Sequence, residues 1–146
     1  MELSGQVEID APRDRVWSLV SDPRKMSGCA AGLEQIEEVG PGRFRLATKV
    51  GSGLMSTRLT ADLELVAEPP DRAAVTGTGE ASGNSLDARG QLTLSGPPGG
   101  PTLIAWQATI AIRGPFASFD KLLEPTAAKV VAEAFDCLRS QLHAGG

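Results

Sequence analysis

Apolar and polar residues alternate along most of the chain, which is the pattern of strands with one buried face. The first such segment, residues 3–9, is followed by two short helical patterns that begin at Pro12 and Pro23. Alternation then returns in six segments separated by glycine- and proline-rich turns, at residues 33–39, 43–50, 58–65, 72–81, 86–94 and 104–112. Strands joined by short turns predict an antiparallel meander with one solvated face.

The pattern changes to a helical period after Gly114-Pro115. Apolar residues recur every three or four positions from Phe116 to Leu142, which predicts a long amphipathic helix. Pro125 lies inside this segment and predicts a kink or a break there. Since only one long helix is available to cover the sheet, we expect an α+β fold in one domain, residues 1–146: a curved seven-stranded sheet around the C-terminal helix, with an apolar ligand cavity between them.

Alternation also selects the side chains that face the helix, and these are the candidate ligand contacts. On the strands and the helix they are Phe44, Leu46, Leu63, Trp106, Ile110, Ile112, Phe119, Leu123, Val131 and Phe135. Ordinary core packing is the alternative interpretation of each. A glycine-flanked tip carries Leu54 and Met55, which predicts a membrane contact or a gate for the cavity. The alternative is that these two residues simply begin the next strand.

Composition and charge argue against several classes of protein. The net charge is −4 and lysine and arginine form no cluster, which argues against nucleic acid as a partner. No segment is apolar for long enough to predict a membrane span, and the N-terminus does not resemble a signal peptide. Cys29 and Cys137 match no metal-site or disulfide-framework spacing. We therefore expect a reduced, cytoplasmic setting with Cys29 as a small buried apolar side chain, while a single bridge remains open.

Candidate catalytic groups are few. The single histidine, His143, lies near the C-terminus and tyrosine is absent, so we predict no catalytic residue and no metal site. Glu80 is the one carboxylate that stands out, because glycines flank it. Glycines in a strand predict a bulge, a close approach of a ligand, or a bend in the sheet. An enzyme would have to draw on polar side chains in the cavity, and the candidates are Thr48, Glu80, Gln107 and Thr109.

Several segments carry a family resemblance. Residues 7–17 (VEIDAPRDRVW) resemble the opening of the START-like (SRPBCC), or helix-grip, superfamily. Residues 77–83 (GTGEASG), 102–106 (TLIAW) and 112–117 (IRGPFA) resemble the family of the carbon monoxide dehydrogenase G subunit. The resemblance implies a helix-grip fold with two short helices after the first strand. It also implies an accessory protein for a membrane-linked molybdenum hydroxylase of the carbon monoxide dehydrogenase type.

The same resemblance implies a quinone or lipid as a non-covalent ligand, and peripheral contact with the inner face of the cell membrane. No covalently bound cofactor is expected. Two alternatives stay open. One is an enzyme like the polyketide cyclases and dehydratases, which use the same fold. The other is a maturation or scaffold factor that contacts the molybdenum enzyme through its surface.

Overall fold

The computed structural model describes residues 1–29, 32–50 and 56–144. After the first strand, β1 (Glu2–Ile9), come the short helices α1 (Arg13–Val20), α2 (Pro23–Met26) and η1 (Ser27–Cys29). The remaining strands are β2 (Leu33–Gly40), β3 (Arg43–Val50), β4 (Thr57–Glu68), β5 (Arg72–Ala81), β6 (Asn84–Ser95) and β7 (Thr102–Arg113). The chain closes with η3 (Ala117–Phe119) and the long helix α3 (Asp120–Ala144).

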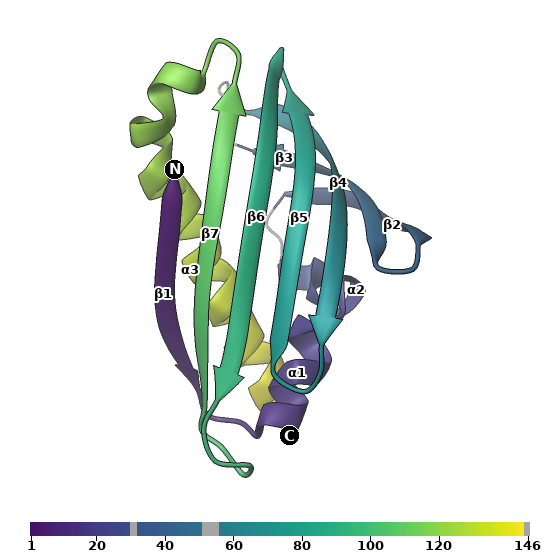
Figure 1. The fold of residues 1–146 in the computed structure, drawn as a ribbon, viewed down its shortest axis with the longest axis vertical. Coiled ribbons are helices and arrows are strands. Elements are labelled where there is room, and N and C mark those ends of the chain that lie inside the picture. The colour runs from purple at the N-terminus through teal and green to yellow at the C-terminus, as the bar shows by residue number, and fades with distance from the viewer. Residues whose placement is uncertain (30–31, 51–55, 145–146) are drawn as a thin grey trace.

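The strands form one antiparallel sheet of seven, in the order β1-β7-β6-β5-β4-β3-β2. This confirms the predicted meander, since every strand but β1 pairs with its neighbour in sequence. The sheet bends around α3, which crosses its concave face on a diagonal, and α1 and α2 lie on the same side at the lower end in Figure 1. Two register shifts between β2 and β3 add to the bend, because β-bulges increase the local twist.

The glycines of β5 have a packing role. Pairing on both sides of β5 runs without a register shift, so Gly77 and Gly79 mark no bulge. A Cβ at Gly77 would lie 2.5 Å from Cδ2 of Leu63, and one at Gly79 would lie 3.1 Å from Cδ1 of Leu59. These glycines therefore make room for leucine side chains that lean over from β4 on the concave side.

The closed core lies at the lower end of the molecule, between the sheet, α1 and the last third of α3. Its members are Ile9, Ala11, Val16, Leu94, Ile104, Leu138 and Leu142. Burying one large aliphatic side chain contributes about 1.5–3 kcal/mol, so this cluster holds the helix to the sheet. Thr102 is also fully buried, and its hydroxyl donates a hydrogen bond to the carbonyl of Ala11 at 2.8 Å.

Helix α3 is continuous from Asp120 to Ala144, so the alternative of a break at Pro125 is wrong. Pro125 lies in the second turn, where it removes a single helical hydrogen bond. Two arginines fix the other end. Nη2 of Arg139 donates to the carbonyl of Glu8 on β1 at 2.9 Å. Nη2 of Arg15 donates to the carbonyl of Leu142 at 2.8 Å, which satisfies one of the free carbonyls at the helix C-terminus.

Candidate functional site

The concave face of the sheet carries most of the predicted ligand contacts. Phe44, Leu63 and Ile110 lie in one row across the strands, because Phe44 pairs with Leu63 and the row continues through Gly77 and Ala88. Directly paired residues point to the same face of an antiparallel sheet. Phe44 is buried, whereas Leu63 and Ile110 are only half-buried. Apolar side chains therefore remain open to a ligand in the middle of this face.

The neighbouring rows extend the same surface. Leu46 and Ile112 are joined through Ala61, Gly79 and Leu86, and both are half-buried. Trp106 shares the face as well, and its ring centroid lies 6.0 Å from that of Phe135 on α3. Val131 is also half-buried on the helix. We call this surface the apolar concave face; its half-buried members are Leu46, Leu63, Trp106, Ile110, Ile112, Val131 and Phe135.

The first half of α3 contributes less than its sequence pattern predicts. Leu123 is 38% exposed, so it does not close over the sheet as the predicted inward position requires. Leu122 and Val130 are 73% and 52% exposed. The side chain of Phe119 lies outside the described part of the structure, as do Leu54 and Met55. The helix therefore covers the concave face at its C-terminal end and leaves apolar side chains uncovered at the other.

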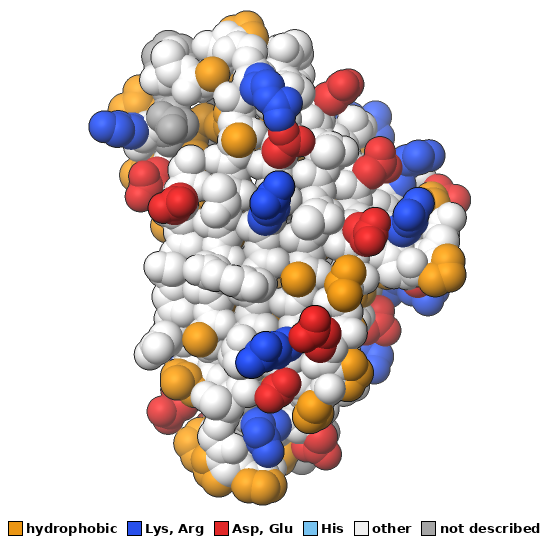
Figure 2. Space-filling model, in the orientation of Figure 1, with side chains coloured by type: hydrophobic (Ala, Val, Ile, Leu, Met, Phe, Trp, Pro, Cys, Tyr) orange, Lys and Arg blue, Asp and Glu red, His pale blue; other side chains and the backbone are white. Residues whose placement is uncertain are grey.

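Charged side chains gather on the opposite, outer face of the sheet, where acidic and basic groups intermingle (Figure 2). Nε of Arg45 lies 2.9 Å from Oδ1 of Asp62, and this hydrogen bond raises the pKa of Arg45 above its ordinary value. Arg43 pairs with Glu64 at 3.7 Å. Two shallow hollows of about 710 and 380 Å³ lie among such side chains on this face. Exposed ion pairs of this kind contribute little to stability, about 0–1 kcal/mol each.

The polar residues considered for catalysis divide between the two faces. Glu80 pairs with Thr60 and Ser85, and Gln107 pairs with Gln91, which places both on the outer face. Thr109, opposite Arg89, also lies there. Of the four candidates only Thr48 is on the concave side, opposite Leu59. Within the described residues, no three histidine, cysteine or acidic side chains are grouped to hold a metal ion.

Asn84 has a positioning role that the sequence reasoning missed. Its side chain is buried, and Nδ2 donates to the carbonyl of Ala81 at 3.1 Å, while Oδ1 accepts from the backbone N–H of Phe116 at 2.8 Å. Gly114 adopts a φ of +117°, and a Cβ there would lie 2.9 Å from Oδ1 of Asn84. Asn84 therefore fixes the connection from β7 to α3. The sequence marks it only as a turn residue after Ser82-Gly83.

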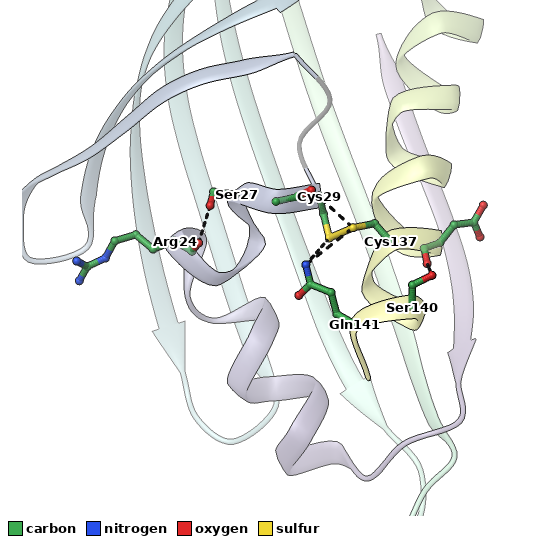
Figure 3. Close-up of a disulfide and its surroundings, with 8 residues drawn as sticks. Arg24, Ser27, Cys29, Cys137, Ser140 and Gln141 are labelled. Carbon is green, nitrogen blue, oxygen red and sulfur yellow. Dashed lines mark hydrogen bonds between the residues drawn. A yellow bond between two sulfur atoms is a disulfide. The ribbon is translucent and has the colours of Figure 1, made fainter. Parts of the chain in front are cut away.

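Cys29 and Cys137 form a disulfide, with their Cα atoms 5.4 Å apart (Figure 3). This corrects the expectation of two reduced thiols and matches the single bridge that the sequence left open, and Cys29 is buried as predicted. The bond joins η1 to α3, across 108 residues of sequence. Nε2 of Gln141, one helical turn after Cys137, points at the pair and lies 3.3 Å from Sγ of Cys29.

Known structures share this architecture. A conserved protein from Geobacillus kaustophilus is 20% identical with a TM-score of 0.89, over 99% of this chain and 96% of that one. A START superfamily protein from Mycobacterium smegmatis is 16% identical with a TM-score of 0.69, over 99% of each chain. A truncated norcoclaurine synthase from Thalictrum flavum is 15% identical with a TM-score of 0.66, over 97% of this chain and 92% of that one. The fold is therefore START-like.

The family of the chain follows from its sequence. No curated protein matches it. Along the residues that the structure describes, no helix is both long enough and apolar enough to cross a membrane. The family model of the carbon monoxide dehydrogenase G subunit (CoxG) matches residues 5–143, which is nearly the whole sequence, and the protein belongs to this family.

Proposed function

We propose that the protein binds an uncharged, apolar ligand, a quinone or a lipid, on its apolar concave face. The observation that carries this proposal is the separation of the two faces. Half-buried aliphatic and aromatic side chains gather on the concave face, and charged side chains gather on the outer one. A partly covered apolar surface of this kind gains free energy when a ligand removes it from water, about 25 cal/mol per Å².

The aromatic pair on this face suits a ligand with a flat ring. Trp106 and Phe135 come from the sheet and the helix, and their planes are tilted by 38°. Aromatic rings bind one another in offset or edge-to-face arrangements, and a quinone ring offers the same kind of surface. The aliphatic neighbours Leu63 and Ile110 suit a hydrocarbon tail. A quinone with an alkyl chain therefore matches both parts of the surface.

The family supports an accessory role beside a molybdenum hydroxylase of the carbon monoxide dehydrogenase type. In this proposal the protein works in the cytoplasm and contacts the inner face of the cell membrane, where an apolar electron carrier is available. Among the similar folds are enzymes, such as an aromatase/cyclase from a Streptomyces species and the norcoclaurine synthase. An enzyme needs polar groups at the reacting atoms. Binding is favoured here because Glu80, Gln107 and Thr109 point away from the concave face.

Native mass spectrometry with organic extraction tests the ligand directly, on protein purified from its own host. A stoichiometric quinone or lipid would support the carrier function. An empty protein that copurifies with a molybdenum enzyme would contradict it and favour the scaffold alternative. Turnover of an aromatic polyketide would favour the enzyme.

A pair of neighbouring substitutions tests the face. Ile110 is on the concave side and Thr109 on the outer side of the same strand. Decyl-ubiquinone, a benzoquinone with a ten-carbon tail, quenches tryptophan fluorescence, and a Trp17→Phe background leaves Trp106 as the reporter of binding. We expect Ile110→Gln to weaken binding about tenfold, which corresponds to about 1.4 kcal/mol, and Thr109→Gln to leave it unchanged. Equal effects of the two substitutions would contradict the assignment.

A further inference from the structure

We propose that the Cys29–Cys137 disulfide is a reversible clasp on α3, whose oxidation state controls how fast a ligand enters and leaves the apolar concave face. This inference rests on the proposed function for its ligand. Its mechanical part, the loosening of α3 on reduction, can be measured without any ligand.

The clasp lies where α3 is attached to the rest of the molecule. The buried contacts of the helix come from Leu138 and Leu142, and Arg139 bonds to the β1 edge beside them. Cys137 lies within this same segment, next to Leu138. The disulfide thus adds a covalent bond to an attachment that otherwise depends on a few side chains, and it ties that attachment to η1.

The other half of the helix is weakly held. Leu122 and Val130 are exposed, and Leu123 is only partly covered. Before the helix, the chain passes through Gly114 and is fixed by the hydrogen bond from the N–H of Phe116 to Asn84. The helix therefore has a fixed connection at its start, a clasp near its end, and loosely packed turns between them over the apolar concave face. When the clasp opens, we expect these loosely packed turns to move more freely over that face.

The two cysteines differ in how accessible they are. In this proposal an incoming thiolate attacks Sγ of Cys137, because Cys137 is partly exposed whereas Cys29 is buried. That attack breaks the S–S bond and forms a mixed disulfide, and Cys29 leaves as a thiolate. The N–H of Gln141, with Nε2 3.3 Å from Sγ of Cys29, stabilises this developing charge until the thiolate takes up a proton.

The reductant is a dithiol, either a protein or a small molecule. Its second thiol displaces Cys137 from the mixed disulfide, so the dithiol is oxidised to a disulfide and the protein gains two thiols. Disulfides in reducing compartments are usually transient rather than purely structural. This bond holds the helix that covers the ligand-binding face. Breaking it therefore changes the freedom of α3 without removing any side chain from that face.

Amide hydrogen exchange of residues 120–134, measured with and without dithiothreitol, tests the clasp itself. The oxidised form is lighter by two hydrogens, so intact mass shows which form is present. We expect faster exchange in the reduced protein. The variant with Cys29→Ala and Cys137→Ala is expected to exchange as the reduced protein does, with or without dithiothreitol. Unchanged exchange on reduction of the native protein would overturn the proposal, and the native protein gives this answer even if the variant fails to fold.

The functional part is tested by loading the protein with decyl-ubiquinone and following its transfer to phosphatidylcholine vesicles through the recovery of tryptophan fluorescence. We expect reduction to speed release by about tenfold, which corresponds to a barrier lower by about 1.4 kcal/mol. Equal release rates in the two states would overturn the control of ligand exchange. If α3 loosens but decyl-ubiquinone binds in neither state, the proposed quinone binding fails while the clasp stands as a switch of the helix.

Discussion

Replacing a leucine in the closed core should mainly lower stability, whereas replacing a leucine on the apolar concave face should mainly lower ligand affinity. Leu94 is 1% exposed and lies opposite Ile104 in the closed core. Leu63 is half-buried on the apolar concave face, in the same sheet. The two substitutions to alanine remove the same atoms, so they differ only in what surrounds them.

The structure sets the expected magnitudes. Truncating a fully buried leucine removes its transfer free energy and leaves a cavity, so Leu94→Ala should cost about 3–4 kcal/mol. That loss lowers the melting temperature by about 6–16 °C for a chain of this size. The Leu63 side chain is already partly exposed to solvent in the folded protein, so truncating it leaves no enclosed void. Leu63→Ala should therefore cost about 1 kcal/mol of stability.

Binding should follow the reverse order. Leu63 is expected to contact the ligand, so Leu63→Ala should weaken decyl-ubiquinone binding about 5- to 10-fold, or about 1–1.4 kcal/mol. Leu94→Ala should leave the dissociation constant unchanged as long as the protein is folded. Urea unfolding at unchanged m-value gives the stability, and tryptophan quenching gives the affinity. If Leu63→Ala destabilises the fold as much as Leu94→Ala does, then this part of the concave face is closed core and is not open to a ligand.

Three further predictions concern the connection into α3, the disulfide and the charge of the site. Asn84→Ala removes the side-chain acceptor of the Phe116 N–H, so it should lower the free energy of unfolding by about 1–3 kcal/mol, as measured in urea. Asn84→Asp keeps an acceptor and should lower it by less; equal losses for the two variants would contradict the positioning role of Asn84. Reduction of the Cys29–Cys137 bond opens a loop that spans 108 residues. The loop-closure model then predicts that the free energy of unfolding falls by up to about 4.7 kcal/mol; an unchanged urea midpoint in dithiothreitol would show that the bond does not constrain the unfolded chain. No ionisable side chain lies on the described concave-face positions of β3 to β7, and Glu38, which pairs with Phe44 from the edge strand β2, forms an ion pair with Arg24. Histidine is the side chain that ordinarily changes charge near neutral pH, and none lies on these strands, so the affinity for uncharged decyl-ubiquinone should change less than about twofold between about pH 6 and about pH 8; a larger change in a protein that stays folded would place a titrating group at the site.

Much of the fold could be predicted because it depends on local periodicity. The alternation of apolar residues gave the seven strands within a few residues of their ends. It also placed Phe44, Leu63 and Ile110 on one face, as their register shows. Successive side chains of a strand point to opposite faces of the sheet. The face of each residue therefore follows as soon as the strand and its neighbours are recognised.

The depth of each side chain could not be predicted in the same way. Phe44 and Leu63 are neighbours in one row, yet Phe44 is buried and Leu63 is half-buried. Leu123 and Leu138 both belong to the apolar stripe of α3, but they are 38% and 0% exposed. Helical periodicity shows which side chains share a stripe, and it contains no information on how far the opposing surface lies from each turn.

Contacts between segments that are far apart in the chain also could not be predicted from local sequence patterns. The spacing of Cys29 and Cys137 fits no motif, since the fold brings them together through η1 and the end of α3. Asn84 looks like an ordinary turn residue until Phe116 is placed beside it. The effect of Pro125 was overestimated for a related reason: its missing hydrogen bond and its clash with the carbonyl four residues earlier fall on the first turn of α3, so the rest of the helix continues undisturbed.

The START-like fold is used both by enzymes and by binding proteins, so the fold cannot decide between them. The side chains on the concave face can. Here leucine, isoleucine, tryptophan and phenylalanine provide contact area, and Thr48 is the one polar candidate among the residues considered for catalysis that lies on that side. The ion pairs Arg43–Glu64 and Arg45–Asp62 lie exposed on the outer face. Glu38, on the edge strand β2, shares the concave row of Phe44 and is paired with Arg24 at 3.7 Å. A surface of this kind can hold an apolar molecule and release it again. This composition is the reason why we propose a carrier rather than a catalyst.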